Sequence, residues 1–164
     1  MLIIAFHETF APVGKATGKP ILAAIWHEGV GGRSGDEVAS TFIAALRHPC
    51  FSDCDQFTFW LDNCTGQNKI WILSGALANE MMNKESGINT VNLKFFTKGH
   101  TFMSADSFHA KVEKKMRHPY QETQKWMGVY NFQDFVEVIK AVCAVPLVMQ
   151  PANFFEYQNG NPPL

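Results

Sequence analysis

The stretch Gln56-Phe-Thr-Phe-Trp-Leu-Asp-Asn-Cys-Thr-Gly-Gln-Asn68 carries the clearest information on the fold. The mostly apolar run from Phe57 to Leu61 predicts a buried strand, and the polar residues after Leu61 predict where it ends. Apolar residues then recur at helical spacing, at Ile70, Leu73, Leu77 and Met81, which predicts a helix that ends before Gly87. A buried strand followed by a helix is typical of α/β proteins.

Before this stretch, the sequence predicts a hairpin over residues 1–27, with its turn at Gly14 to Pro20. A glycine-rich segment, residues 29–35, leads into a helix that ends at Pro49. That segment has two interpretations: a phosphate-binding loop, or a flexible connection ending in an N-terminal helix signal. Its glycine spacing matches neither the dinucleotide fingerprint nor the P-loop, which favours the connection.

After the stretch, we expect a strand over Thr90–Thr97, a helix from Ser104, a polar loop over 117–130 and a helix around Phe132–Ile139. The proline-rich tail is expected to be irregular, apart from one short strand at Leu147–Met149. The resulting order, β-β-α-β-α-β-α-α, predicts one mixed sheet with helices on its faces.

Length and charge limit the class of protein. The chain has 164 residues, which fits one domain with its own core. It carries 14 Lys and Arg against 15 Asp and Glu, a net charge of -1 that excludes a histone-like polycation and an acidic disordered tail. Binding to DNA through a local basic patch remains compatible with this charge.

No segment looks like a signal peptide or a membrane helix, so no membrane partner is expected. Cys50 and Cys54 could form half of a zinc site, but no second ligand pair follows at finger spacing. Reduced thiols inside the cell are the favoured interpretation.

Asp62 is the first candidate site residue, because sites of open α/β sheets lie at the carboxyl ends of strands. Asn63, Gln67 and Asn68 surround it in sequence with neutral donors and acceptors. The alternative is an ordinary Asx-turn or helix cap. The density of polar neighbours favours a site.

The helix from Ser104 carries a second candidate group. Asp106, His109 and Glu113 are spaced i, i+3 and i+7, so they share one stripe beside the apolar one. The stripe could point carboxylates at a metal ion, or it could be a solvated face with a capping Asp106 and a His109–Glu113 pair. Spacing alone does not separate the two.

Other candidates are less specific. His100 follows Gly99 and could be a ligand, a proton shuttle or part of a turn. His7-Glu8 and His27-Glu28 are expected to pair across the hairpin strands. The helix from Ser104 also ends in a basic cluster, which could contact phosphates or simply suit the helix dipole. The cluster consists of Lys111, Lys114, Lys115 and Arg117.

Carboxylates with amide and imidazole neighbours, and without paired thiolates, favour Mg²⁺ or Mn²⁺ over zinc. Two such ions would suit phosphodiester cleavage.

Four blocks of the sequence resemble a transposase-derived domain family of eukaryotic mobile elements. They are Phe6-His-Glu-Thr-Phe-Ala-Pro12, Trp26-His-Glu-Gly29, Trp60-Leu-Asp-Asn-Cys-Thr-Gly-Gln-Asn68 and Gly99-His-Thr-Phe-Met-Ser-Ala-Asp-Ser-Phe-His109. The family is similar to an RNase H-like catalytic core of DDE transposases and integrases. The resemblance covers residues 1–143 and leaves 144–164 as a separate proline-rich tail.

In such enzymes three acids bind two Mg²⁺ ions. The resemblance puts the second acid at Asp62 and the third at Asp106, with Glu113 as the competing choice. It implies that Asn63 and Gln67 orient water or phosphate, that Asn68 is a further nucleic-acid contact, and that Lys114 and Lys115 contact the DNA backbone. It also implies DNA as the partner and a nuclear location.

The first acid of the resemblance would lie on a strand before Met1. The expected fold is therefore an RNase H-like mixed sheet that lacks its first strand, with catalysis weakened or lost, so the sequence leaves open whether this chain is an enzyme. One alternative is a domesticated transposase remnant that binds DNA or protein without catalysis. Another is an unrelated one-metal hydrolase or phosphatase, with His100 near Asp62.

Overall fold

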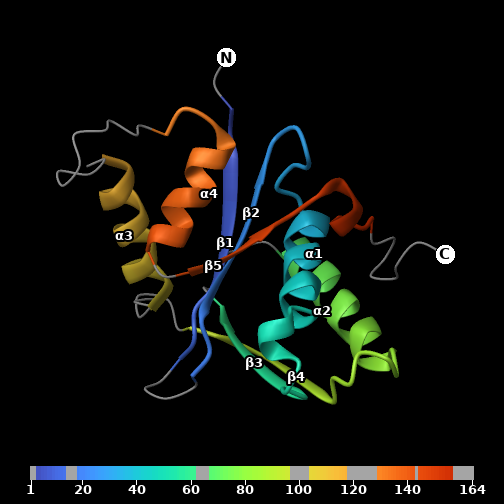
Figure 1. Ribbon diagram of the computed structural model, residues 1–164. Helices are drawn as coiled ribbons and strands as arrows, with labels where there is room; N and C mark the ends of the chain where they lie inside the picture. Colours follow the sequence, from blue (N-terminus) through green and yellow to red (C-terminus); the bar gives the residue numbers. More distant parts are fainter. Residues whose placement is uncertain are drawn as a thin grey trace. The chain divides into compact units, whose positions relative to one another are not determined.

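The computed structural model describes residues 3–13, 18–61, 67–96, 104–117, 129–142 and 144–156 (Figure 1). The chain divides into two compact units. The first unit comprises Met1–Val30 and Phe102–Met149, and the second comprises Gly31–Thr101 and Gln150–Leu164. Each unit is therefore built from two separate stretches of sequence.

The first unit contains a three-stranded mixed sheet with the order β1-β2-β5. β1 (Ala5–Phe10) runs antiparallel to β2 (Ile21–His27), which confirms the predicted hairpin. β5 (Ala144–Val148) runs parallel to β2 on its other side. β2 is the central strand of this sheet, and its residues from Leu22 to Trp26 are all buried, which explains its apolar sequence.

Two helices cover one face of this sheet, α3 (Ser104–Arg117) and α4 (Phe132–Ala141). Phe108 and Val112 of α3 pack with Ile139 of α4 and Ile25 of β2 in one hydrophobic cluster. Helix α4 begins with a capping box, in which Asn131 and Asp134 satisfy each other's backbone N–H groups. Helical periodicity had predicted both helices.

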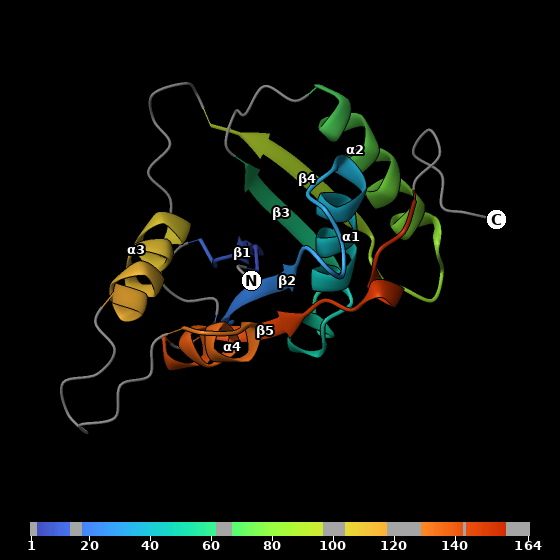
Figure 2. The same ribbon diagram turned by 90° about the horizontal axis from the view of Figure 1, so that it is seen from above.

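The second unit contains a two-stranded parallel sheet, β3 (Gln56–Leu61) with β4 (Thr90–Phe95), shown side by side in Figure 2. Its helices are α1 (Gly35–Leu46) and α2 (Gln67–Met82). Phe42 of α1 meets Phe59 of β3 edge-to-face, with ring centroids 4.9 Å apart. Two short 3-10 helices, Pro49–Phe51 and Pro151–Asn153, also belong to this unit.

An ion pair between a half-exposed Arg47 and a buried Glu80 joins the end of α1 to α2. The Arg47 guanidinium donates two hydrogen bonds to the Glu80 carboxylate, at 2.8 and 2.6 Å. The Glu80 side chain is only 4% exposed, so the pairing compensates a desolvated charge in the interface between the two helices.

The α/β class is confirmed, but the described strands form two small sheets where the sequence predicted one. Two further features differ from the sequence prediction. The strand in the tail begins at Ala144, earlier than predicted, and joins the sheet of the first unit. β3 is not buried on both faces, because exposed and half-buried residues alternate along it. Strand pairing depends on distant partners, which local periodicity does not encode.

Candidate functional site

Several predicted site residues lie outside the described part of the structure: Asp62, Asn63 and His100. Gln67 and Asn68 lie in the first turn of α2, where the structure describes the backbone but not their side chains. The structure therefore gives no geometry for the polar group around Asp62.

The edge at which β3 and β4 end is described. Leu61 of β3 pairs with Phe95 of β4, and the Phe96 N–H donates to the Leu61 carbonyl at 3.0 Å. Because the strands are parallel and in register, they end at the same edge of the sheet. In α/β sheets this is the edge that carries ligand sites.

Helix α3 carries the other predicted acids on its solvent side. Asp106 and Glu113 are exposed, whereas Phe108 and Val112 face the core. Lys111 and Lys114 are also exposed, and Lys115 is half-buried. Asp106 and Glu113 are seven residues apart, about 10 Å along the helix axis. At this separation the two carboxylates could each bind a different ion, or only one of them could bind a given ion.

The His109 side chain, which the spacing placed on one stripe with Asp106 and Glu113, lies against β1. Its ring stacks on His7 of β1, with centroids 4.6 Å apart, and its Nε2 lies 3.0 Å from the Thr9 hydroxyl. His7 and Thr9 share one face of β1, because alternate residues of a strand point the same way. Sequence reasoning missed this cluster, although the period of β1 gave a signal for it.

The predicted pairing of His7-Glu8 with His27-Glu28 is wrong. In the observed register His7 lies opposite Ile25, and His27 lies opposite Ala5. His27 instead packs edge-to-face on Phe132, and its Nδ1 accepts from the Gly29 N–H at 3.1 Å. The register of a hairpin depends on the type and length of its turn, and the sequence pattern predicted only where the turn lies.

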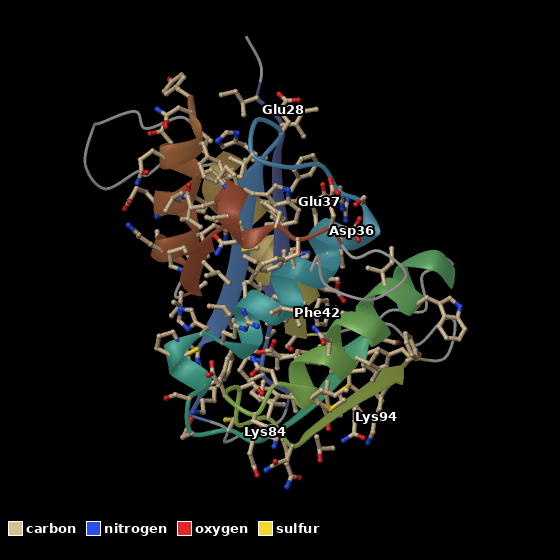
Figure 3. The ribbon with its side chains drawn as sticks, turned by 90° about the vertical axis from the view of Figure 1, so that its right-hand side faces the viewer. Glu28, Asp36, Glu37, Phe42, Lys84 and Lys94 are labelled. Atoms are coloured by element: carbon tan, nitrogen blue, oxygen red, sulfur yellow. The ribbon has the colours of Figure 1, made fainter. Side chains whose placement is uncertain are left out.

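The glycine-rich segment before α1 serves as a helix cap. The N–H groups of Gly32 and Ser34 donate to the Glu37 carboxylate at 3.0 and 2.8 Å, and Asp36 and Glu37 lie at the start of α1 (Figure 3). Burial alone would raise the pKa of Glu37, but hydrogen bonds from the Ser34 hydroxyl and from nearby backbone N–H groups lower it. These N–H donors already bind the Glu37 carboxylate. The geometry therefore agrees with a connecting segment that ends in a helix cap, rather than with a phosphate-binding loop.

A thiol–imidazole pair lies directly after α1. His48 Nδ1 is 2.9 Å from the Cys50 sulfur and 3.3 Å from the Cys50 nitrogen. Cys50 and Cys54 are not joined by a disulfide. His48 lies at the N-cap of the short helix Pro49–Phe51, and the cysteine spacing alone did not point to it.

In the described ranges, no three His, Cys, Asp or Glu side chains come together as a set of metal ligands. The donors that the sequence offers for a metal are the carboxylates of Asp62, Asp106 and Glu113. Oxygen donors of this kind fit Mg²⁺ or Mn²⁺ rather than a thiophilic ion.

Within the same described ranges, no helix has both the length and the apolar character needed to cross a bilayer. Comparisons with family models, with curated proteins and with solved structures find no match.

Proposed function

We propose that the chain is the RNase H-like catalytic core of a DDE-type transposase or integrase, acting on phosphodiester bonds of DNA with Mg²⁺ or Mn²⁺. The observation that supports this most is the parallel pair β3–β4. Asp62 follows β3 directly in the sequence, and the helix after β4 exposes Asp106 and Glu113. An acid after one strand and an acid on the helix after the next agree with the order that the resemblance implies.

Each candidate residue has a proposed role. Asp62 and Asp106 hold the metal, with Glu113 as the competing third acid, and His100 serves as a further ligand or proton shuttle. Asn63 and Gln67 orient water or phosphate, Asn68 is a further nucleic-acid contact, and Lys114 and Lys115 contact the DNA backbone. When bound, the divalent ions would stabilise the attacking and leaving oxygens of the displacement.

The test measures metal binding as well as cleavage, because two acids alone are expected to hold metal weakly. Mn²⁺ bound to the protein is followed by electron paramagnetic resonance, and cleavage of labelled DNA is followed with Mg²⁺ or Mn²⁺. We expect Asp62→Asn and Asp106→Asn each to reduce bound Mn²⁺ and any cleavage by about tenfold or more. Glu137→Gln, an exposed carboxylate on α4, is the matched control.

Two outcomes would contradict this assignment. Asp62→Asn and Asp106→Asn variants that bind Mn²⁺ and cleave DNA like the parent would exclude both acids. Loss of Mn²⁺ binding with Glu113→Gln but not with Asp106→Asn would move the third acid to Glu113.

The second candidate function is a binding module without catalysis, derived from a transposase. The exposed positions of Lys111 and Lys114 on α3 favour it, since they offer a basic surface independent of any metal. This function predicts DNA affinity that EDTA leaves unchanged. It also predicts that Lys114→Ala with Lys115→Ala weakens binding, with a lower salt dependence, whereas Lys140→Ala on α4 does not.

A further inference from the structure

The two-stranded sheet of the second unit presents one face to solvent, which we call the outer face. It consists of alternate residues of β3 and β4, together with the residue after β4: Gln56, Thr58, Trp60, Thr90, Asn92, Lys94 and Phe96. All of these are exposed except the half-buried Phe96. Phe57 and Phe59, which alternate with them, point to the opposite face, where Phe59 contacts Phe42 of α1.

Trp60 is the unusual residue of the outer face. It is 40% exposed, although tryptophan on a solvated strand leaves much apolar area in water. Lys94, its partner in the strand register, places Nζ 5.1 Å from the centroid of the Trp60 ring. The Phe96 ring also packs near the Trp60 ring, and the centroids of these two rings are 5.2 Å apart. An aromatic pair and a cation therefore share one end of the face.

The rest of the outer face is polar and uncharged. Thr58 and Asn92 are register partners one step along from Trp60 and Lys94, and they offer hydroxyl and amide groups. None of the residues that form this face is a carboxylate. Two acids flank β3 in sequence: Asp55 precedes it at the end away from Trp60, where it binds Asn89 at 2.9 Å, and Asp62 follows Trp60 by two residues.

We propose that the outer face binds single-stranded nucleic acid, with a base stacked on Trp60 and a backbone phosphate near Lys94. Exposed aromatic rings on a sheet, a neighbouring cation and neutral hydrogen-bonding groups are the chemistry that recognises unpaired bases. An apolar protein partner would need a continuous apolar patch, and Thr58, Asn92 and Thr90 interrupt this face. The inference rests on the proposed function for its choice of nucleic acid as the partner.

Single strands are preferred for a geometric reason. In a duplex both faces of every internal base are stacked on neighbours, so no internal ring is available to Trp60 without breaking base pairs. Lys94 lies over the Trp60 ring in the free protein, and its flexible side chain must move toward the phosphate when a base arrives.

The experiment measures fluorescence anisotropy of a labelled oligothymidylate of about twelve nucleotides, in EDTA at low salt. A duplex of the same length and an oligouridylate are measured in parallel, the latter to separate DNA from RNA. We expect Trp60→Ala to raise Kd about 5- to 100-fold, and Trp60→Phe to retain most of the affinity. Trp71→Ala, which removes a 77% exposed tryptophan from α2, is the matched control and should change nothing.

A second pair of variants tests the cation. Lys94→Ala should weaken binding and reduce the slope of log affinity against log salt by about 0.7. Lys84→Ala, which removes an exposed lysine after α2 in the same unit, should leave the slope unchanged (Figure 3).

Two results would overturn the inference: equal affinity for duplex and single strand, or unchanged affinity of Trp60→Ala. Trp60→Phe keeps an aromatic ring in the strand, so it separates loss of stacking from loss of folding. Because binding is measured in EDTA, its failure is distinguishable from failure of metal-dependent cleavage. Metal-dependent cleavage by the parent protein, without binding of the single strand, would overturn this inference alone.

Discussion

At the scale of single residues, the Glu37 carboxylate shows how local chemistry sets an element boundary. It receives backbone hydrogen bonds from Gly32 and Ser34, and the Ser34 hydroxyl also donates to it. Ser34 in turn accepts from the Asp36 N–H at 3.2 Å. The start of α1 is thus determined by residues adjacent in sequence, which is why the sequence pattern located it within one residue.

The lowered pKa of Glu37 leads to a pH-dependent prediction. A carboxyl whose pKa is lower in the folded state stabilises the fold above its usual value of 4.5, and this contribution is lost as the pH falls through the folded value. We expect Glu37→Gln to lower the free energy of unfolding by at most about 1 kcal/mol at neutral pH, since the group is largely solvated. The measurement is urea unfolding at several pH values.

In that titration, the difference between Glu37→Gln and the parent should shrink as the pH drops below 4.5. Glu85→Gln, at an exposed position after α2, serves as the control. A difference that stays constant down to acid pH would show that the charge of Glu37 does not contribute.

At the scale of elements, helix α3 is held to β1 by a polar contact as well as by its apolar face. His109 stacks on His7 and binds Thr9, while Phe108 enters the core beside it. Periodicity predicted the helix and its apolar stripe. It did not predict that His109 turns toward β1, because the position of β1 relative to α3 is a tertiary property.

Removing this contact should loosen α3 more than the rest of the first unit. We expect His109→Ala to cost about 1–2 kcal/mol, from a lost hydrogen bond and lost ring packing. Amide hydrogen exchange should show the largest loss of protection in α3. Lys111→Ala, on the exposed side of the same helix, should leave exchange unchanged.

Equal loss of protection in α3 for His109→Ala and Lys111→Ala would contradict a specific role for the histidine pair. Thr9→Val provides a second test, because it removes the hydroxyl but keeps the shape and leaves the ring stacking in place.

At the scale of the whole chain, both units are completed by the C-terminal stretch. β5 pairs with β2 in the first unit. In the second unit, the Phe155 N–H donates to the buried hydroxyl of Ser40 at 3.0 Å, and the Phe154 ring lies against Gly31. The predicted separate tail after residue 143 thus contributes described structure to each unit.

A series of shortened chains should measure this contribution. A chain that ends after Gln150 keeps β5 but loses the Phe155–Ser40 hydrogen bond, and we expect its melting temperature to fall by several degrees. A chain that ends after Cys143 also loses β5 and should lose most cooperative unfolding. Thermal unfolding followed by circular dichroism gives both results.

The chain that ends after Glu156 is the control, since it retains every described residue. If it loses as much stability as the chain that ends after Gln150, then residues 151–156 do not stabilise the second unit. Ser40→Ala in the full chain measures the single hydrogen bond separately.

The sequence by itself determined the helices, the strands and their order, because periodicity and caps act over a few neighbouring residues. It also placed Asp106 and Glu113 on one stripe of α3 beside the apolar residues, since spacing along a helix fixes the side on which residues lie. Only the tertiary structure decided the register of the hairpin, the pairing of β5 with β2, the His7–His109 contact and the open face that carries Trp60. Each of these depends on groups far apart along the chain, whose meeting is selected by packing and hydrogen bonding of the whole unit rather than by local preference.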